Sequence, residues 1–225
     1  MQSMFFLFDV DATMLLVWGY RLSWLEFFGT ATGLVCVWLT ARERLLGWMA
    51  GIINAALFLL LFLQVGLYSD MLLQVFYIVT SVYGWWRWAN PRTKDEANAR
   101  SELRVRSMTN RELAAWFAAA AAGSLILGFV TARLPSWLPT LFKEPAVYPY
   151  ADALVASLSV CATFVMAEKK IQCWVIWIIV DAIAVVLYAS RGIHFMAAEY
   201  FVFGVICVSG LAGWKAEMKR YAYEI

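Results

Sequence analysis

Residues 41–88, ARERLLGWMAGIINAALFLLLFLQVGLYSDMLLQVFYIVTSVYGWWRW, decide the fold, because they recur without a gap 126 residues later at 167–214. The two segments are identical at 11 of 48 positions, among them Trp48 and Trp174, Gly66 and Gly192, Gly84 and Gly210, and Trp88 and Trp214. Chance similarity between apolar segments explains shared Ile, Ala, Val and Leu, but not tryptophans and glycines in register. We therefore interpret the segments as copies of one unit, and such duplication is typical of membrane transporters.

The composition predicts an integral membrane protein. The chain is 63% hydrophobic and 15% charged, with a mean hydropathy of +0.69, which is far outside the range of soluble domains. Twelve Trp and 10 Tyr suit aromatic belts at two membrane surfaces. The four cysteines lie inside apolar runs without metal-ligand spacing, so we expect small buried hydrophobic residues: Cys36, Cys161, Cys173 and Cys207. The sequence also shows no nucleotide-binding loop and no nucleophile–base pair, so we expect neither an enzyme nor a cofactor.

Seven apolar stretches have the length of about 20 residues that a membrane-spanning helix needs. We place them near 23–40, 46–66, 70–88, 112–131, 149–166, 172–190 and 195–214. The predicted fold class is therefore an all-α membrane protein.

Three further segments lie outside the predicted repeat units 23–88 and 149–214. Residues 1–22 lack a basic start, and Asp9 and Asp11 interrupt their apolar run, so we expect an interfacial or peripheral helix rather than a cleaved signal. Residues 89–148 hold a long polar segment, a linker helix near 112–131 and a proline-containing outer loop over 132–148. Residues 215–225 form a terminal tail.

The basic residues predict the orientation. Seven spans put 14 Lys and Arg on one side of the membrane and only four on the other: Arg21, Arg133, Lys143 and Arg191. By the positive-inside rule the richer side is cytoplasmic, so the N-terminus lies outside and the C-terminus inside. The fourth span reverses direction between the copies, and both three-helix repeats therefore run in parallel. This 3+1+3 plan is similar to that of the SWEET sugar transporters, an analogy of fold that defines no substrate.

Polar side chains inside the spans mark the expected transport pathway, because ionisable groups in hydrocarbon are unfavourable unless paired or hydrated. In the sixth span Trp174, Trp177, Asp181 and Tyr188 are spaced i, i+3, i+7 and i+14 and share one helical face. Indole rings beside a carboxylate suit a flat cationic ring. The alternative is an interfacial tryptophan pair with one structurally paired aspartate.

The other spans add polar residues at matching depths. The third span carries Gln74 and Tyr77, and the second carries Asn54. The seventh contributes Glu199 and Tyr200, of which Tyr200 is equivalent to Gln74 by the 126-residue shift. An amide suits a carboxamide or sugar hydroxyls.

Three ionisable residues near the span ends have simpler interpretations. Glu26 and Asp152, also 126 residues apart, suit hydrated positions at the outer surface. The only histidine, His194, suits a solvated loop, although proton coupling through it is an alternative.

At these residues the chain resembles the PnuC vitamin transporters, and specifically their nicotinamide riboside branch. The matching strings cover almost the whole chain from Trp24 to Trp214: Gly51-Ile-Ile-Asn54, Leu72-Leu-Gln74-Val-Phe76, Tyr83-Gly-Trp-Trp86, Trp174-x-x-Trp177-x-x-x-Asp181, Gly192 and Glu199-Tyr200. One departure concerns Asp181, where nicotinamide riboside members often carry Asn. An acid there either strengthens attraction to a pyridinium or shifts the preference within the family.

The resemblance implies uptake of nicotinamide riboside across the bacterial inner membrane by facilitated diffusion, with trapping by a separate cytoplasmic ribosylnicotinamide kinase. It also implies a homotrimer. The substrate-binding residues we predict are Asn54, Gln74, Tyr77, Trp174, Trp177, Asp181, Tyr188, Glu199 and Tyr200. Three alternatives stay open: the same fold carrying thiamine or riboflavin, a proton-coupled symporter, and a membrane enzyme or sensor.

Overall fold

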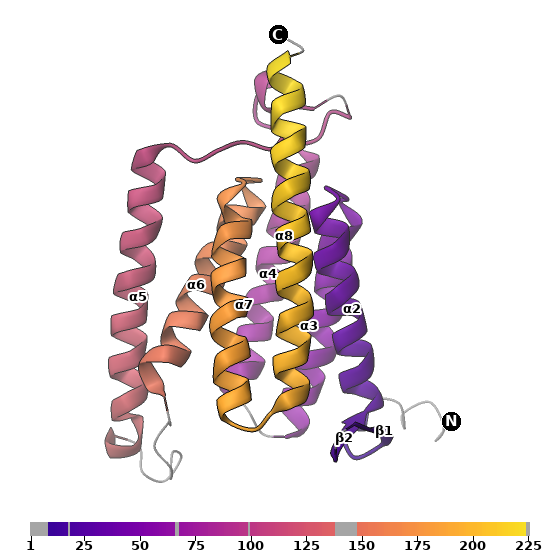
Figure 1. The fold of residues 1–225 in the computed structure, drawn as a ribbon, viewed down its shortest axis with the longest axis vertical. Helices are drawn as coiled ribbons and strands as arrows, with labels where there is room; N and C mark the ends of the chain where they lie inside the picture. The colour runs from indigo at the N-terminus through magenta and orange to yellow at the C-terminus, as the bar shows by residue number, and fades with distance from the viewer. Residues whose placement is uncertain (1–8, 18, 66–67, 99, 138–147, 224–225) are drawn as a thin grey trace.

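The computed structural model of the protein describes residues 9–17, 19–65, 68–98, 100–137 and 148–223 (Figure 1). Seven α-helices lie within these residues: α2 Trp24–Ala41, α3 Leu46–Gln64, α4 Tyr68–Ala89, α5 Asn110–Trp137, α6 Pro149–Ala167, α7 Gln172–Ser190 and α8 His194–Tyr223. By length and hydropathy, six of the described helices can cross a membrane, and α4 is the exception. The polar residues Gln74, Thr80, Ser81 and Arg87 in α4 explain its lower hydropathy.

A β-hairpin, rather than the expected helix, precedes the first span. β1 (Thr13–Val17) pairs antiparallel with β2 (Tyr20–Ser23), so the prediction of a helix over residues 1–22 was wrong for this part. Residues 1–8 lie outside the described residues. Gly19, at φ +83°, supplies the left-handed conformation that a tight hairpin turn requires. Ser23 then ends the hairpin and begins α2 through a capping box with Glu26.

Two other boundaries differ from the prediction. Helix α5 continues beyond residue 131 to Trp137, with Pro135 in its last turn. A proline so close to the helix end removes one backbone hydrogen bond, and the helix stops two residues later. Residues 138–147 of the predicted outer loop lie outside the described residues. At the other end of the chain, α8 extends to Tyr223 through most of the predicted tail.

The helices fall into two trios with equivalent bounds. The first trio is α2, α3 and α4, and the second is α6, α7 and α8. Adding 126 to the last residue of α2, to both ends of α3 and to the first residue of α4 gives the corresponding bounds of α6, α7 and α8. The following loops also match, since Glu43 (φ 57°) and Lys169 (φ 52°) are equivalent residues in the same unusual conformation.

Contacts between helices close the two trios into one ring. Around it, α2 packs on α3, α3 on α4, α4 on α6, α6 on α7, α7 on α8, and α8 on α2. Helix α5 packs mainly against the outside of α6, at the edge of the bundle (Figure 1). The two places where the trios meet are the α2–α8 seam and the α4–α6 seam.

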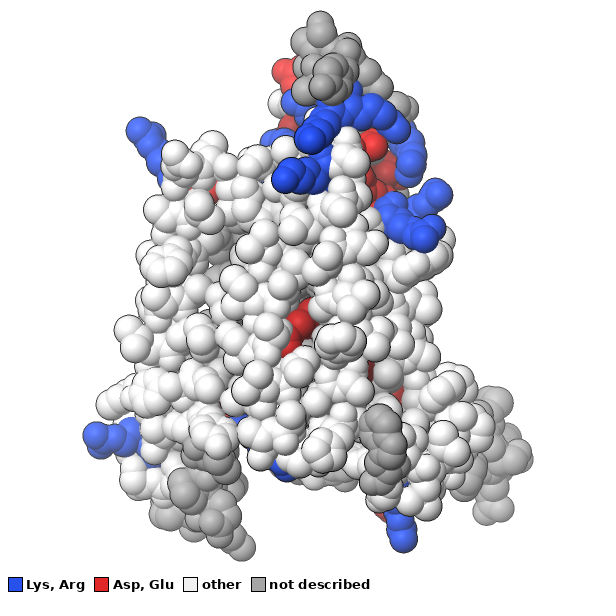
Figure 2. Space-filling model, viewed as in Figure 1, with Lys and Arg blue, Asp and Glu red and all other residues white. Residues whose placement is uncertain are grey.

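The ends of the bundle differ in charge. We call one the basic end; it is formed by the α2–α3 loop (42–45), the α4–α5 connector (90–109), the α6–α7 loop (168–171) and the end of α8. The other, the hairpin end, carries β1–β2 and the α7–α8 turn (Figure 1). Figure 2 shows most of the visible Lys and Arg at the basic end, with a nearly uncharged belt below it. Acidic atoms show through at the middle of that belt.

The α4–α5 connector is ordered, which its polar sequence did not predict. Its Leu103 and Val105 are buried in the core. Backbone hydrogen bonds join Leu103 N to Trp88 O, Arg106 N to Lys169 O, and Ile171 N to Arg106 O. The connector therefore binds the end of α4 to the α6–α7 loop of the second trio.

Candidate central transport site

Four tryptophans form a closed cluster toward the basic end, which we call the tryptophan cluster: Trp48, Trp88, Trp174 and Trp214. Trp48 meets Trp88 edge-on with centroids 5.4 Å apart, and the equivalent Trp174 meets Trp214 at 5.3 Å, both at 87°. Trp88 and Trp214 touch each other at 5.7 Å. Because aromatic pairs favour such edge-to-face geometry, the cluster joins the two trios.

The structure places Trp174 in this cluster rather than on an open wall. Its side chain has no exposed surface, and its ring packs against Gly210 so closely that a Cβ there would lie 2.8 Å away. Trp177, one turn further along α7, is half-buried and packs on the edge of the cluster. Helical spacing correctly put both residues on one face, but only Trp177 keeps accessible surface.

Five predicted site residues come together nearer the middle of the bundle; we call them the central polar cluster: Tyr77, Asp181, Tyr188, Glu199 and Tyr200. The Tyr188 and Tyr200 rings stack with centroids 5.3 Å apart at 14°. The other three side chains lie within electrostatic range of the Tyr200 phenol. Helices α4, α7 and α8 thus contribute side chains to one group.

Asp181 is the most informative member of this cluster. Its side chain is only 4% exposed, and its Oδ2 accepts no hydrogen bond from the described residues. The Cys207 thiol lies within hydrogen-bonding distance of the Asp181 carboxyl group, and Gly204 lets α8 approach, with a Cβ there 3.6 Å from the Asp181 Cβ. The Trp177 indole N–H also lacks a partner among the described residues. Unpaired buried polar groups are rare, because each one is unfavourable by a few kcal/mol.

The two predicted amides have different environments. Asn54 Nδ2 donates to the Gly29 carbonyl at 2.7 Å, which holds α3 against α2. Its amide also fills the space beside Gly33, where a Cβ would lie 3.0 Å from Nδ2. Gln74 is 9% exposed on α4 at the position equivalent to Tyr200. Asn54 therefore has a structural bond, whereas Gln74 is the amide at cluster depth.

Glu199 connects the central polar cluster to the hairpin end. Its carboxyl interacts with Thr30 on α2 and lies within electrostatic range of Glu26. Tyr20 in β2 donates a hydrogen bond to Glu26 and stacks on Phe195 of α8, with ring centroids 5.7 Å apart. Burial, together with the Glu26 carboxylate, raises the pKa of Tyr20 well above its usual range. The hairpin therefore packs over a pair of acidic residues.

The other residues near the membrane surface behave as structural groups. Asp152 accepts two hydrogen bonds from Arg191, both at 2.8 Å, and Glu26 forms the capping box of α2 with Ser23. His194 is the exposed first residue of α8. Of the four cysteines, Cys36 is half-buried and the others are buried.

Sequence reasoning missed two contributors that meet across the seams. Phe203, the counterpart of Tyr77, has its ring tip 3.5 Å from a Cβ at Gly33 on α2. Tyr77 in turn interacts with Ser159 on α6, the counterpart of Gly33. The 126-residue shift could have identified Phe203. It relates Tyr77 to Phe203 and Gly33 to Ser159, so the contact of Tyr77 with Ser159 predicts one between Phe203 and Gly33.

Taken together, this arrangement can hold a flat cation. Stacked phenols and an indole offer aromatic faces, and a desolvated carboxylate offers a counter-charge. Among the described residues, no group of three His, Cys, Asp or Glu side chains is placed to hold a metal ion.

Comparisons with known proteins agree with a transport role. A family model described as nicotinamide mononucleotide transporter matches residues 23–216. The nicotinamide riboside transporter PnuC of Escherichia coli (strain K12) is 30% identical over 213 residues, which cover 87% of each chain. The riboflavin/roseoflavin transporter RibM of Streptomyces davaonensis is 24% identical over 218 residues, which cover 94% of this chain and 93% of RibM.

A solved structure shares the fold. The crystal structure of the vitamin B3 transporter PnuC matches with a TM-score of 0.65 at 19% identity, covering 97% of this chain and 87% of that one. The chain belongs to the nicotinamide mononucleotide transporter family, and is thus a PnuC-type, multi-pass membrane vitamin transporter.

Proposed function

We propose that the protein carries nicotinamide riboside into the cell across the bacterial inner membrane. The single observation that carries this proposal is Asp181, a buried carboxylate whose Oδ2 accepts no hydrogen bond from the described residues. A permanently cationic pyridinium ring would supply the missing counter-charge without a proton. The substrate named for the 30% identical relative has that ring.

The surrounding residues suit the remaining parts of the substrate. Trp177, Tyr188 and Tyr200 would stack on the ring, and Gln74 would bind the carboxamide. Tyr77 and Glu199 would bind ribose hydroxyls. Asn54 would keep α2 and α3 in place beside the site, and Trp174 would support Trp177 from the tryptophan cluster.

The proposed architecture is two parallel three-helix repeats joined by the inverting helix α5, in the manner of SWEET transporters. The matched bounds of the two trios and the closed ring of contacts support it. Helix α4 would be the seventh span, between α3 and α6. The basic end would face the cytoplasm by the positive-inside rule, with the N-terminus outside.

The proposed mechanism is facilitated diffusion, with the substrate trapped by a separate cytoplasmic kinase. The absence of a nucleotide-binding loop from the sequence supports it. A phosphorylated substrate would need a cationic clamp. The Lys and Arg side chains visible in Figure 2 lie toward the two ends of the bundle instead. We also propose a homotrimer as the functional form.

Calorimetric titration of the purified protein tests the substrate. Nicotinamide riboside should bind more tightly than its monophosphate, thiamine or riboflavin, and Trp177→Ala and Asp181→Ala should each abolish binding while the protein stays folded. Riboflavin is the instructive competitor, because the RibM relative is named for it. Tighter binding of thiamine or riboflavin, or normal binding by both variants, would refute this substrate and site.

Uptake into proteoliposomes tests the mechanism. Nicotinamide riboside should equilibrate without any imposed proton gradient and should not accumulate above the external concentration. Accumulation that depends on a proton gradient would instead indicate a symporter.

A further inference from the structure

At the basic end, an ion pair between Glu43 and Lys169 joins equivalent positions of the two trios. Lys169 Nζ lies 2.9 Å from Glu43 Oε2, and the two residues are 126 positions apart. The Lys169 side chain has no exposed surface, and its ammonium lies 4.7 Å from the centroid of the Trp88 ring. Burial lowers the pKa of Lys169, while the Glu43 carboxylate acts in the opposite direction. The pair therefore closes the basic end directly over the tryptophan cluster.

On one side of this pair, the α4–α6 seam is filled. Tyr83 donates a 2.6 Å hydrogen bond to Glu168, and the fully buried Arg87 pairs with Glu168 at 3.1 Å and with Glu96 at 2.9 Å. The Trp88 indole donates to the Met166 carbonyl at 3.1 Å. The α4–α5 connector covers these contacts and binds both flanking elements through its backbone.

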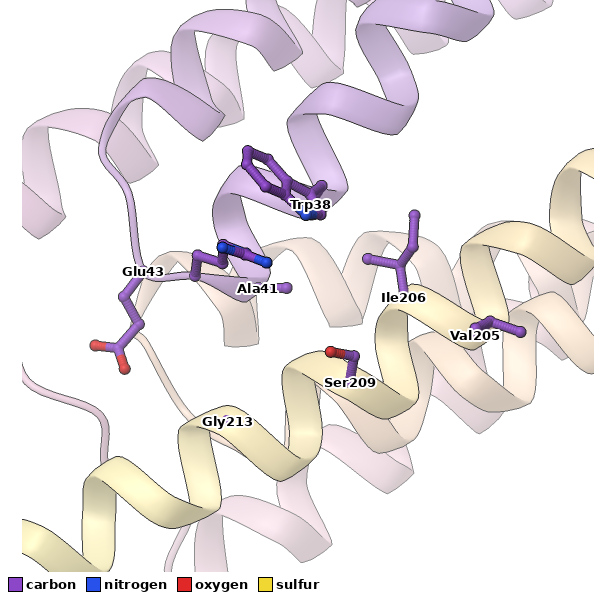
Figure 3. Close-up of a pocket in the computed structure, with 8 residues that line it drawn as sticks. Trp38, Ala41, Glu43, Val205, Ile206, Ser209 and Gly213 are labelled. Carbon is purple, nitrogen blue, oxygen red and sulfur yellow. The ribbon is translucent and has the colours of Figure 1, made fainter.

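On the other side, the equivalent α2–α8 seam is hollow. It contains a pocket of about 350 Å³ that is open on one side, and its lining includes Ala41, Arg42, Glu43, Ser209 and Gly213 (Figure 3). The 126-residue shift shows why. Ser209 and Gly213 occupy the positions of Tyr83 and Arg87, and Arg42 occupies that of Glu168. Ser209 and Gly213 are smaller than Tyr83 and Arg87. The carboxylate of Glu168, which accepts their hydrogen bonds, is replaced by the cationic side chain of Arg42.

The two seams thus differ in how freely they can separate. Separating the α4–α6 seam would break the ion pair of the fully buried Arg87 with Glu168, two hydrogen bonds and the backbone bonds of the connector, and breaking a buried ion pair is strongly unfavourable. The α2–α3 loop has an ion pair on one side and the open pocket on the other. Because closely packed groups have little room to move, the seam with free space beside it should separate more easily.

We propose that cargo leaves toward the cytoplasm through the α2–α8 seam, which opens when the Glu43–Lys169 ion pair separates while the α4–α6 seam stays closed. This inference rests on the transport activity and orientation proposed above. It makes the cytoplasmic gate asymmetric although the two trios match.

The main test transfers the filled seam onto the hollow one. The variant Arg42→Glu with Ser209→Tyr and Gly213→Arg places the residues of the α4–α6 seam at the equivalent positions. It should bind nicotinamide riboside as the wild type does but lose uptake into proteoliposomes. Wild-type uptake by this variant would overturn the proposal.

A reversible cross-link gives a second test that does not depend on how well the triple variant folds. In a chain whose native cysteines are replaced, Ala41→Cys with Gly213→Cys bridges the α2–α8 seam, where a Cβ at Gly213 lies 3.7 Å from the Ala41 carbonyl. The control, Phe76→Cys with Phe164→Cys, places a cysteine pair across the α4–α6 seam, where the native rings are in contact with centroids 5.8 Å apart. Cross-linking should stop uptake only across the α2–α8 seam, and reduction should restore it. Equal effects at both seams, or none at either, would refute the asymmetry.

A third measurement separates this proposal from the choice of substrate. In a chain that keeps only Cys207, beside Asp181, a membrane-impermeant maleimide should label it from the cytoplasmic side of inside-out vesicles. The triple substitution should greatly slow that labelling. If the wild type carries no nicotinamide riboside but this difference holds, the substrate is wrong and the gate stands. If uptake is normal and the labelling rates are equal, the gate is wrong and the substrate stands.

Discussion

The tryptophan cluster and the central polar cluster show opposite uses of one duplicated unit. In the tryptophan cluster the equivalent residues are identical, and Trp48 packs on Gly84 as Trp174 packs on Gly210. In the central polar cluster the equivalents differ, since Asp181 matches Ala55. The first cluster is closely packed around two glycines, and the second contains a carboxylate oxygen without a hydrogen-bond partner among the described residues. Equivalent residues are thus identical where the two trios pack closely together, and they differ at the predicted site.

The largest expected effect comes from filling the glycines of the tryptophan cluster. A Cβ at Gly84 would lie 2.5 Å from the Trp48 ring, and one at Gly210 would lie 2.8 Å from Trp174. We expect Gly84→Ala to destabilise the protein by about 3 kcal/mol and Gly210→Ala by about 2 kcal/mol, because a buried indole cannot move aside. Thermal unfolding and the yield of monodisperse protein would measure this.

Gly213→Ala is the matched control on the same helix as Gly210. Its Cβ would lie 3.7 Å from the nearest heavy atom found, an ordinary contact. Alanine is the better helix former, so this variant should keep or gain up to about 1 kcal/mol of stability. Equal losses in all three variants would show that the tryptophan cluster is not closely packed.

The second effect concerns charge at the central polar cluster. Asp181→Asn should weaken binding of nicotinamide riboside roughly 10- to 100-fold, because it removes the negative charge that attracts the cationic ring in a desolvated site. Binding of the neutral dihydronicotinamide riboside should change little. Titration of both compounds into both proteins isolates the ring charge, and an equal loss for the two would show that Asp181 acts only through shape.

A smaller effect should distinguish two tryptophans that the repeat makes equivalent. Trp88 Nε1 donates to Met166 O at 3.1 Å, whereas Trp214 Nε1 has no hydrogen-bond partner among the described residues. Trp88→Phe should therefore destabilise the protein by about 1 kcal/mol more than Trp214→Phe does. Chemical or thermal unfolding of the two variants in one detergent gives the difference. Identical values would mean that the hydrogen bond adds no net stability.

The smallest effect is the acid sensitivity of the α4–α5 connector. Burial alone would raise the pKa of Glu96, but hydrogen bonds from Arg92 and Arg87 and the Arg106 charge outweigh it and lower the pKa to about 2. This carboxylate therefore stabilises the fold fully above about pH 4.5, and its contribution is lost as the pH falls toward 2.

Glu96→Gln measures that contribution. The variant should be less stable than the wild type at neutral pH, and the difference between their melting temperatures should shrink below pH 4.5. A constant difference down to pH 3 would contradict a role for the ionised carboxylate.

Much of the fold followed from hydrophobic runs and the repeat. The predicted spans match the helix bounds within a few residues, except where α5 and α8 extend further. The hairpin over Thr13–Ser23 escaped prediction because its short apolar run has no helical or strand period strong enough to decide between the two. The connector escaped because Leu103 and Val105 are buried only by partners distant in the sequence.

The sequence predicted only part of how the candidate site residues are arranged. Helical spacing put Trp174, Trp177 and Asp181 on one face, which is a local property. Whether an indole on that face stays accessible depends on the opposite helix, and Gly210 and Trp214 bury Trp174 completely. The hollow in the α2–α8 seam likewise depends on tertiary packing. The shift shows which of its residues are equivalent to those of the α4–α6 seam, but only the folded structure brings them together.

The sequence by itself therefore determined that the chain is a duplicated helical membrane protein, because span length, hydropathy and register are set by neighbouring residues and by the bilayer. Tertiary structure alone decided which indoles are buried, which carboxylate lacks a partner and which seam is hollow. These properties arise from contacts between residues far apart in the chain, and two matching repeats can pack differently wherever their side chains differ in size or charge.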